Sequence, residues 1–240
     1  MTINAATQDA LDRIAQRAQD VQRAFTPGAV PEFGDVATPV ASSRPALDTL
    51  SVAPPDQAYF VTTDARGRVV YTRDGSFALQ GGTLVGHDGR PIAGFGADGS
   101  ASGPLRVDDV DEALGRVANV RIEADGSLAY DRAVIDPRTG ARERERVAVG
   151  RVALARFPAA TKLHAVDASH VAPPPGTVAL TGRPGDGSFG FVSPMRREES
   201  RIDFNRSLDR LEEAYVMFDA LQAVHKAQGS TNKTAMDLLK

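Results

Sequence analysis

The stretch Tyr71-Thr72-Arg73-Asp74-Gly75-Ser76-Phe77 continues through Gly82-Thr83-Leu84-Val85 to Asp88-Gly89-Arg90-Pro91-Ile92. Short apolar segments alternate here with glycine-containing turns, a pattern typical of antiparallel strands joined by hairpins. Gly75 and Gly89 each follow an aspartate, and we expect both to adopt positive φ in turns, where valine would be strained. The stretch therefore predicts a β-rich core.

The same alternation of apolar segments and turns extends over residues 58–192, with further turns at Asp98-Gly99, Asp125-Gly126 and Pro137-Arg138-Thr139-Gly140. The strands that we expect between the turns are Ala58–Thr62, Val69–Thr72, Ser76–Leu79, Thr83–Val85, Val117–Ile122, Ser127–Ile135 and Val147–Phe157. Turns this frequent favour a closed or double-layered β architecture. We predict a mainly β fold, with a central antiparallel β barrel or sandwich over residues 58–195 and N- and C-terminal α-helices that associate.

Both ends of the chain have helical periodicity. Residues 1–25 are expected to form an N-terminal assembly helix and residues 196–240 a C-terminal one, separated from each other by a Pro/Ala-rich linker (residues 26–57) and the β domain. The apolar residues recur at spacings of three and four and are Leu11, Ile14, Ala18 and Val21 in the first helix and Phe204, Leu208, Leu211, Tyr215, Phe218 and Leu221 in the second. Such a seam needs a partner, which is either the other terminal helix or a neighbouring copy of the protein.

Composition excludes several classes of function. A net charge of −3 and a pI near 5.8 give no basic stripe for nucleic acid. The absence of cysteine excludes disulfides and thiolate metal sites. No apolar run is long enough for membrane insertion, and the N-terminus lacks the features of a cleaved signal peptide.

The patterns that could carry chemistry are weak. Gly94-Phe95-Gly96-Ala97-Asp98-Gly99 fits a dinucleotide fingerprint, but the following Ser100–Pro104 cannot begin the helix that binds pyrophosphate. The acidic residues within Val107–Leu114 are more typical of a capped helical turn than of a calcium loop. The four histidines, at positions 87, 164, 170 and 225, lack zinc spacing, and we expect alanine at any of them to leave function intact. We predict no catalytic, cofactor or metal site.

Residues Arg142–Arg146 alternate arginine and glutamate. One interpretation is a solvated hairpin arm with cross-strand charge pairs. The other is a complementary patch for a neighbouring subunit.

Four motifs occur in a characteristic order. The first, from Tyr71, is followed by Pro91-Ile92-Ala93-Gly94, then by Val149-Gly150 with Leu154-Ala155-Arg156-Phe157-Pro158, and then by the Gly-rich Gly187–Val192 that leads through Ser200–Asp203 into the last helix. This order resembles the axial proteins of the bacterial flagellum, the rod and hook subunits. The residues that carry the resemblance are Tyr71, Thr72, Arg73, Asp74, Gly75, Phe77, Asp88, Gly89, Gly150, Phe157 and Pro158.

The resemblance implies a structural subunit of the basal-body rod that polymerises through its terminal helices into the axial drive-shaft tube. It implies no enzymatic activity and no cofactor, and its partners would be copies of itself and other rod or hook subunits. Such proteins lie in the periplasm-spanning basal body and leave through the flagellum's own type III export channel without a cleaved signal peptide. The modest length favours rod over hook, and Thr26-Pro27-Gly28, which lacks the family's aromatic residue, indicates a divergent member. The alternatives are a non-polymerising rod-like assembly factor and a soluble β-domain ligand-binding protein or enzyme.

Overall fold

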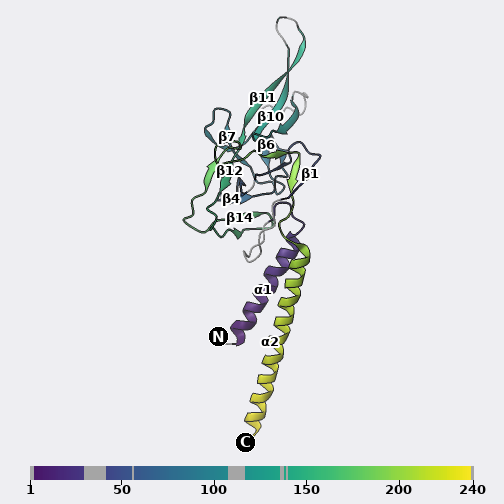
Figure 1. Cartoon of the computed structure of the whole chain (residues 1–240), viewed down its shortest axis with the longest axis vertical. Coiled ribbons are helices and arrows are strands. Elements are labelled where there is room, and N and C mark those ends of the chain that lie inside the picture. The colour runs from purple at the N-terminus through teal and green to yellow at the C-terminus, as the bar shows by residue number, and fades with distance from the viewer. Residues whose placement is uncertain are drawn as a thin grey trace. The chain divides into compact units, whose positions relative to one another are not determined.

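The structure, a computed structural model, describes residues 3–29, 42–55, 57–107, 117–135, 138 and 140–238. The chain divides into two compact units. The helical unit contains Met1–Phe25 and Ile202–Lys240, and the β unit is Thr26–Arg201. The predicted fold class is confirmed, since the fold is mainly β with one helix at each end (Figure 1).

In the helical unit, α1 (Ile3–Arg23) and α2 (Phe204–Leu238) pack side by side (Figure 1). Asp203 caps α2, because its Oδ1 accepts a hydrogen bond from the backbone N–H of Arg206 at 3.1 Å. The 21 residues of α1 span about 31 Å and the 35 residues of α2 about 52 Å. One helix is therefore much longer than its partner.

Two larger sheets organise the β unit, and all their strand pairs are antiparallel. The six-stranded sheet contains, in spatial order, β13 (His164–Ala165), β14 (His170–Ala172), β4 (Val69–Thr72), β3 (Tyr59–Thr63), β12 (Leu154–Arg156) and β15 (Leu180–Gly182). The five-stranded sheet contains β8 (Ala101–Pro104), β7 (Ala93–Gly96), β11 (Arg142–Val152), β10 (Ser127–Ile135) and β9 (Val117–Ile122). Both sheets end on open edge strands, so the described strands form no closed barrel.

Three two-stranded sheets complete the β unit. They pair β1 (Ser43–Pro45) with β17 (Arg196–Glu198), β2 (Val52–Ala53) with β16 (Ser193–Pro194), and β5 (Ala78–Gln80) with β6 (Thr83–Val85). The Gly81-Gly82 dipeptide connects the last pair with both residues at positive φ, as the two-residue hairpin requires.

A single apolar core connects the two larger sheets. Its fully buried members include Phe60, Phe77, Leu84, Leu128 and Leu154. Phe60 and Phe77 meet edge to face, with ring centroids 4.9 Å apart. Along β3, buried residues alternate with half-buried ones, as expected for a strand with one face in this core.

Part of the segment expected to be a linker belongs to the β unit. Residues 42–55 contribute β1 and β2, and Ser51 and Val52 are completely buried. The backbone N–H of Val52 donates to the carbonyl of Gly75 at 3.0 Å, which ties this segment to the first motif. Short proline-flanked strands of this kind can pair at sheet edges although they show no sequence periodicity. Residues 30–41 lie outside the described residues.

The hairpin of β10 and β11 is the longest in the β unit, and its end projects from the rest of that unit (Figure 1). The predicted acidic turn falls within residues 108–116, outside the described residues. The glycine-rich stretch 94–99 forms the end of β7 and a turn in which Gly99 has a φ of +83°, so no helix follows it. Within the described residues, neither helix has the length and apolarity that a membrane span needs.

Candidate assembly interface

The first motif forms the centre of the β unit. Thr72 is buried and its hydroxyl donates to the carbonyl of Ser169 at 2.8 Å while accepting from the backbone N–H of Asp74 at 3.0 Å. Asp74 in turn accepts from the N–H of Ser76 at 2.9 Å, which shapes the turn that follows β4. The side chains of Thr72 and Asp74 thus position backbone.

Arg73 is completely buried and pairs with Glu198, which lies 125 residues later in the chain. Its Nε donates to Oε1 and its Nη2 to Oε2 of the carboxylate, both at 2.6 Å, the two-point geometry that makes arginine–carboxylate pairs strong. The guanidinium also donates to the carbonyl of Ala58 and lies 5.4 Å from the ring centre of Tyr59. Burial raises the pKa of Tyr59, although the charge of Arg73 acts to lower it.

The Arg73–Glu198 pair joins the beginning and end of the β unit. Glu198 closes β17, its Oε1 also accepts from Arg201 at 2.8 Å, and its carbonyl accepts from the N–H of Gly28 at 3.2 Å. The N–H of Arg201 donates to the carbonyl of Ala29 at 2.9 Å. The two segments that continue into the helices are therefore both bonded to the site of the first motif.

Gly75 has a different role from the one predicted. Its φ is not positive, and its constraint is space, because a Cβ there would lie 1.7 Å from the carbonyl oxygen of Val52. The expectation of positive-φ strain was therefore wrong for Gly75, whereas Gly89 has a φ of +80° as predicted. Only the close approach of β2, which sequence spacing could not reveal, explains the glycine at position 75.

The later motif residues pack around the same sheet. The Phe157 ring lies 4.8 Å from that of Tyr71 and 5.8 Å from that of Tyr59. Gly150 permits close strand pairing, since a Cβ there would lie 2.3 Å from the carbonyl oxygen of Phe95. Pro158 is exposed and begins a turn, with its carbonyl accepting from the N–H of Thr161 at 2.9 Å.

Asp88 belongs to a polar cluster that the sequence did not indicate. The buried His170 places Nδ1 2.8 Å from Asp167 and Nε2 3.6 Å from Asp88, and Arg90 bridges the same two carboxylates at 2.8 and 3.0 Å. Partial burial raises the pKa of Asp167, but the hydrogen bonds and positive charges of its neighbours, above all His170, outweigh it and lower that pKa far below its ordinary value. The cluster fastens the Asp88-Gly89 turn to the turn between β13 and β14.

No group of acidic or histidine side chains within the described ranges has the arrangement of a metal site. Of the four histidines, those at positions 87, 164 and 225 are exposed, and only His170 is buried. The first motif, the Arg73–Glu198 pair and the His170 cluster thus hold backbone segments of the β unit in place.

The predicted apolar seams lie in the helical unit, where they divide into covered and uncovered positions. The Phe25 and Phe204 rings meet with centroids 5.1 Å apart at one end of the helix pair. Half-buried positions include Ile14, Ala18 and Val21 of α1 and Leu211, Phe218 and Leu221 of α2. Leu11, Phe204, Leu208 and Tyr215 remain exposed.

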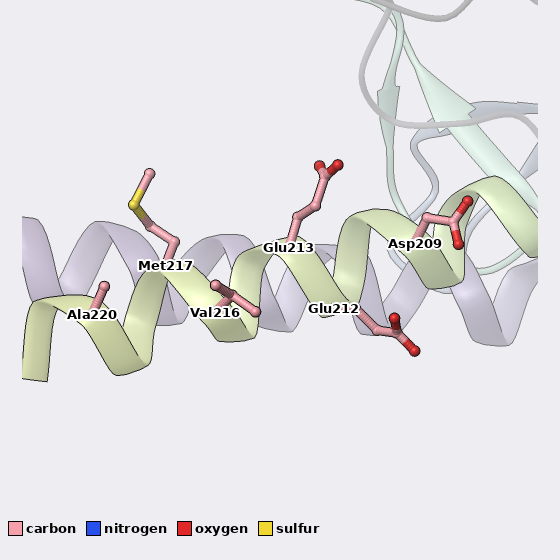
Figure 2. Close-up of a pocket in the computed structure, with 6 residues that line it drawn as sticks. All are labelled: Asp209, Glu212, Glu213, Val216, Met217 and Ala220. Atoms are coloured by element: carbon pink, nitrogen blue, oxygen red, sulfur yellow. The ribbon is translucent and has the colours of Figure 1, made fainter.

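A second stripe on α2, which the seam prediction missed, lies away from α1. Figure 2 shows α2 with α1 behind it, and the labelled side chains line an open groove and project from the near side and edge of α2. They follow the helical repeat and are Asp209, Glu212, Glu213, Val216, Met217 and Ala220. Val216 and Met217 are 70% and 59% exposed, an unusual state for adjacent large apolar residues. An all-round distribution of apolar residues, rather than a single seam, is the signal that could have identified this stripe.

The two ends of the β unit are thus fastened together, and each leads along the chain into one of the paired helices. In a comparison with protein families, residues 56–130 match the family model described as "Flagellar hook protein FlgE/F/G D1 domain". The matched region runs from just before β3 into β10 and includes the first motif and the Asp88-Gly89 turn. This match supports membership of the flagellar rod and hook protein family. A search of the curated proteins found no match.

Proposed function

We propose that this protein is a subunit of the flagellar basal-body rod that polymerises through α1 and α2 with copies of itself and with other axial subunits. The D1 match supports a flagellar axial structural protein. The apolar surface of α2 that α1 leaves uncovered supports polymerisation, because apolar side chains on a helix are stabilised when a partner removes them from water.

The helix lengths supply a second argument. Phe25 meets Phe204 at one end, and Thr7 lies near Gln222 further along. This pairing brings Ile3 level with about residue 226, so the last part of α2 extends beyond α1 within the chain. Isolated helical segments of about a dozen residues are marginally stable in water. In the proposed polymer, neighbouring subunits pack against this extension.

The rod, rather than the hook, is favoured by the simplicity of the β unit. A further domain inserted between the helices would form an additional compact unit, and the chain between them clusters as one unit, Thr26–Arg201. In this proposal the subunit lies in the periplasm-spanning part of the flagellum and is exported through the flagellar channel.

The observation that carries the proposal is the exposed Val216–Met217 pair, and Val216→Asp tests it. The substitution places a charge on α2 without touching the α1-facing residues Leu211 and Phe218, so the purified chain should keep its melting temperature. We expect the variant to be absent from purified basal bodies, because the charge would be buried in the interface.

Val178→Asp is the matched control, since Val178 is 83% exposed in a loop of the β unit. It should be incorporated normally. Incorporation of Val216→Asp at the level of the unchanged protein would contradict polymerisation through this stripe and favour the non-polymerising assembly factor.

A further inference from the structure

The outer end of the β10–β11 hairpin, residues 131–135 and 142–146, is called the arm below. Its strands pair Asp131 with Arg146, Arg132 with Glu145, Ala133 with Arg144, Val134 with Glu143 and Ile135 with Arg142. β9 accompanies β10 only as far as Arg132, and β7 joins β11 only from Gly150 onward. Among the described strands, the arm is therefore a two-stranded ribbon beyond Arg132, with both edges open there, and it projects from the rest of the β unit in Figure 1.

The register determines which charges share a face. Residues directly opposite each other in an antiparallel pair lie on the same face, and successive residues alternate between faces. One face consequently carries Asp131, Ala133, Ile135, Arg142, Arg144 and Arg146. Three arginines and one aspartate give it a formal charge of +2.

The opposite face carries Arg132, Val134, Glu143 and Glu145. Two glutamates and one arginine give it a formal charge of −1. The ion pair between Arg132 Nη2 and Glu145 Oε2, at 2.8 Å, is consistent with this assignment because both residues belong to the same face. The arm is therefore cationic on one face and anionic on the other.

The charged side chains of the arm differ in whether other residues of the chain form ion pairs with them. At the base of the arm, Arg146 pairs with Glu123, and Arg121 lies 3.2 Å from Asp131. Further out, Glu143 and Arg144 are exposed, and no ion pair joins either of them to another described residue, although the charge of Arg144 contributes to the lowered pKa of Asp131. Beside them, Ile135 is 68% exposed. Exposed opposite charges next to an exposed apolar side chain are suited to a contact with a second molecule.

We propose that the arm is a docking surface between copies of this chain, in which the cationic face of one arm lies against the anionic face of the arm of the next copy. This rests on the proposed function, because it supplies a contact between subunits of the polymer that is separate from the terminal helices. The contact is heterologous, since two different faces meet, and a heterologous contact can repeat from subunit to subunit without pairing off. Opposite charge also fixes which face meets which.

Cross-linking tests the geometry directly. The natural chain has no cysteine, so single cysteines can be placed at Ala133, on the cationic face, and at Val134, on the anionic face, without background. Equal amounts of the two full-length variants are mixed in 50 mM salt and treated with a short bis-maleimide. We expect the 133–134 product to exceed the 133–133 and 134–134 products, and to decline in 1 M salt, where the screening length falls to about 3 Å.

Charge reversal tests the cause. In both cysteine variants, Glu143→Arg makes both faces cationic, and Arg142→Glu with Arg144→Glu makes both faces anionic, so reversing either face alone should lower the yield of the 133–134 product. An exposed ion pair changes association by roughly two- to fivefold, which sets the size of each loss. Reversing both faces together, with all three substitutions, exchanges the signs of the faces and should restore the yield. Unchanged circular dichroism of each variant is the control for folding.

Absence of cross-links, equal yields of the three products, or no effect of reversing one face alone would overturn the proposal. In each case the arm charges serve only to keep the open strand edges from pairing. The result is separable from that of the proposed function, which is read from incorporation of Val216→Asp into basal bodies. If the cross-linking test fails but Val216→Asp is still absent from basal bodies, only the proposed arm contact is refuted, and the proposed function stands.

Discussion

Glu198→Gln is expected to destabilise the β unit severely. The substitution preserves the size of the side chain but removes the negative charge that lies 2.6 Å from the buried guanidinium of Arg73. Arg73 has no exposed side-chain surface, so water cannot replace the lost carboxylate. The carbonyls of Ala58 and Pro55 would remain as acceptors but carry no net charge.

The magnitude follows from the burial of both partners. Breaking a buried ion pair by removing one member costs about 3–5 kcal/mol, because an uncompensated charge stays inside the protein. For a domain of this size, each kcal/mol lowers the melting temperature by about 2–4 °C. We therefore expect the melting temperature of the β unit to fall by roughly 6–20 °C.

The measurement is thermal and urea unfolding of the full chain, followed by circular dichroism and tyrosine fluorescence, since the chain has no tryptophan. Asp186→Asn is the matched control, because it also turns an acid into its amide next to an arginine. Arg183 lies 2.8 Å from Asp186 in a solvent-exposed pair, which should contribute at most about 1 kcal/mol.

A double variant separates the loss of charge pairing from the loss of packing. Arg73→Met with Glu198→Leu replaces the pair by apolar side chains and should recover part of the loss, as apolar replacements of buried ion pairs often do. A loss for Glu198→Gln no larger than that of Asp186→Asn would refute the reasoning that this pair holds the two ends of the β unit together.

Further predictions concern the glycines, the polar cluster and the histidines. Gly75→Ala should cost about 3 kcal/mol or more in urea unfolding, because its Cβ would overlap the Val52 carbonyl. Gly89→Ala, whose Cβ would meet only the end of the Gln80 side chain at 3.7 Å, should cost about 1 kcal/mol from positive φ. The lowered pKa of Asp167 stabilises the fold above the unfolded-state pKa of about 3.9, and this contribution is lost as pH falls toward the folded-state pKa. Asp167→Asn should therefore lower the urea midpoint at pH 7, and the difference from the unchanged protein should shrink at pH 3; an equal difference at both values would contradict the linkage. His170→Ala should lower the melting temperature, an effect on stability that the sequence-based expectation of intact function did not address, while the exposed His164→Ala should not. Equal melting temperatures of the two variants would count against the cluster.

The sequence alone determined the local elements of this protein. Val69–Thr72, Thr83–Val85 and Ser127–Ile135 were expected as strands with the bounds that the structure has. Their signals are local, because turn glycines and short apolar runs act within a few residues. The terminal helices were equally predictable from spacings of three and four, and the motif order predicted the family that the D1 match supports.

Tertiary structure decided what joins these elements. Glu198 lies 125 residues from Arg73, and an acidic residue near the end of a β domain has no pattern that assigns it a buried partner. The reason for Gly75 likewise depends on β2, which the proline-rich composition of residues 26–57 hid. The opposite charges of the two arm faces depend on strand register, because a slip of one residue would mix them. Periodicity and turns depend on residues that are close in the chain, so they can be predicted from the sequence. Long-range pairing depends on which surfaces the folded chain brings together.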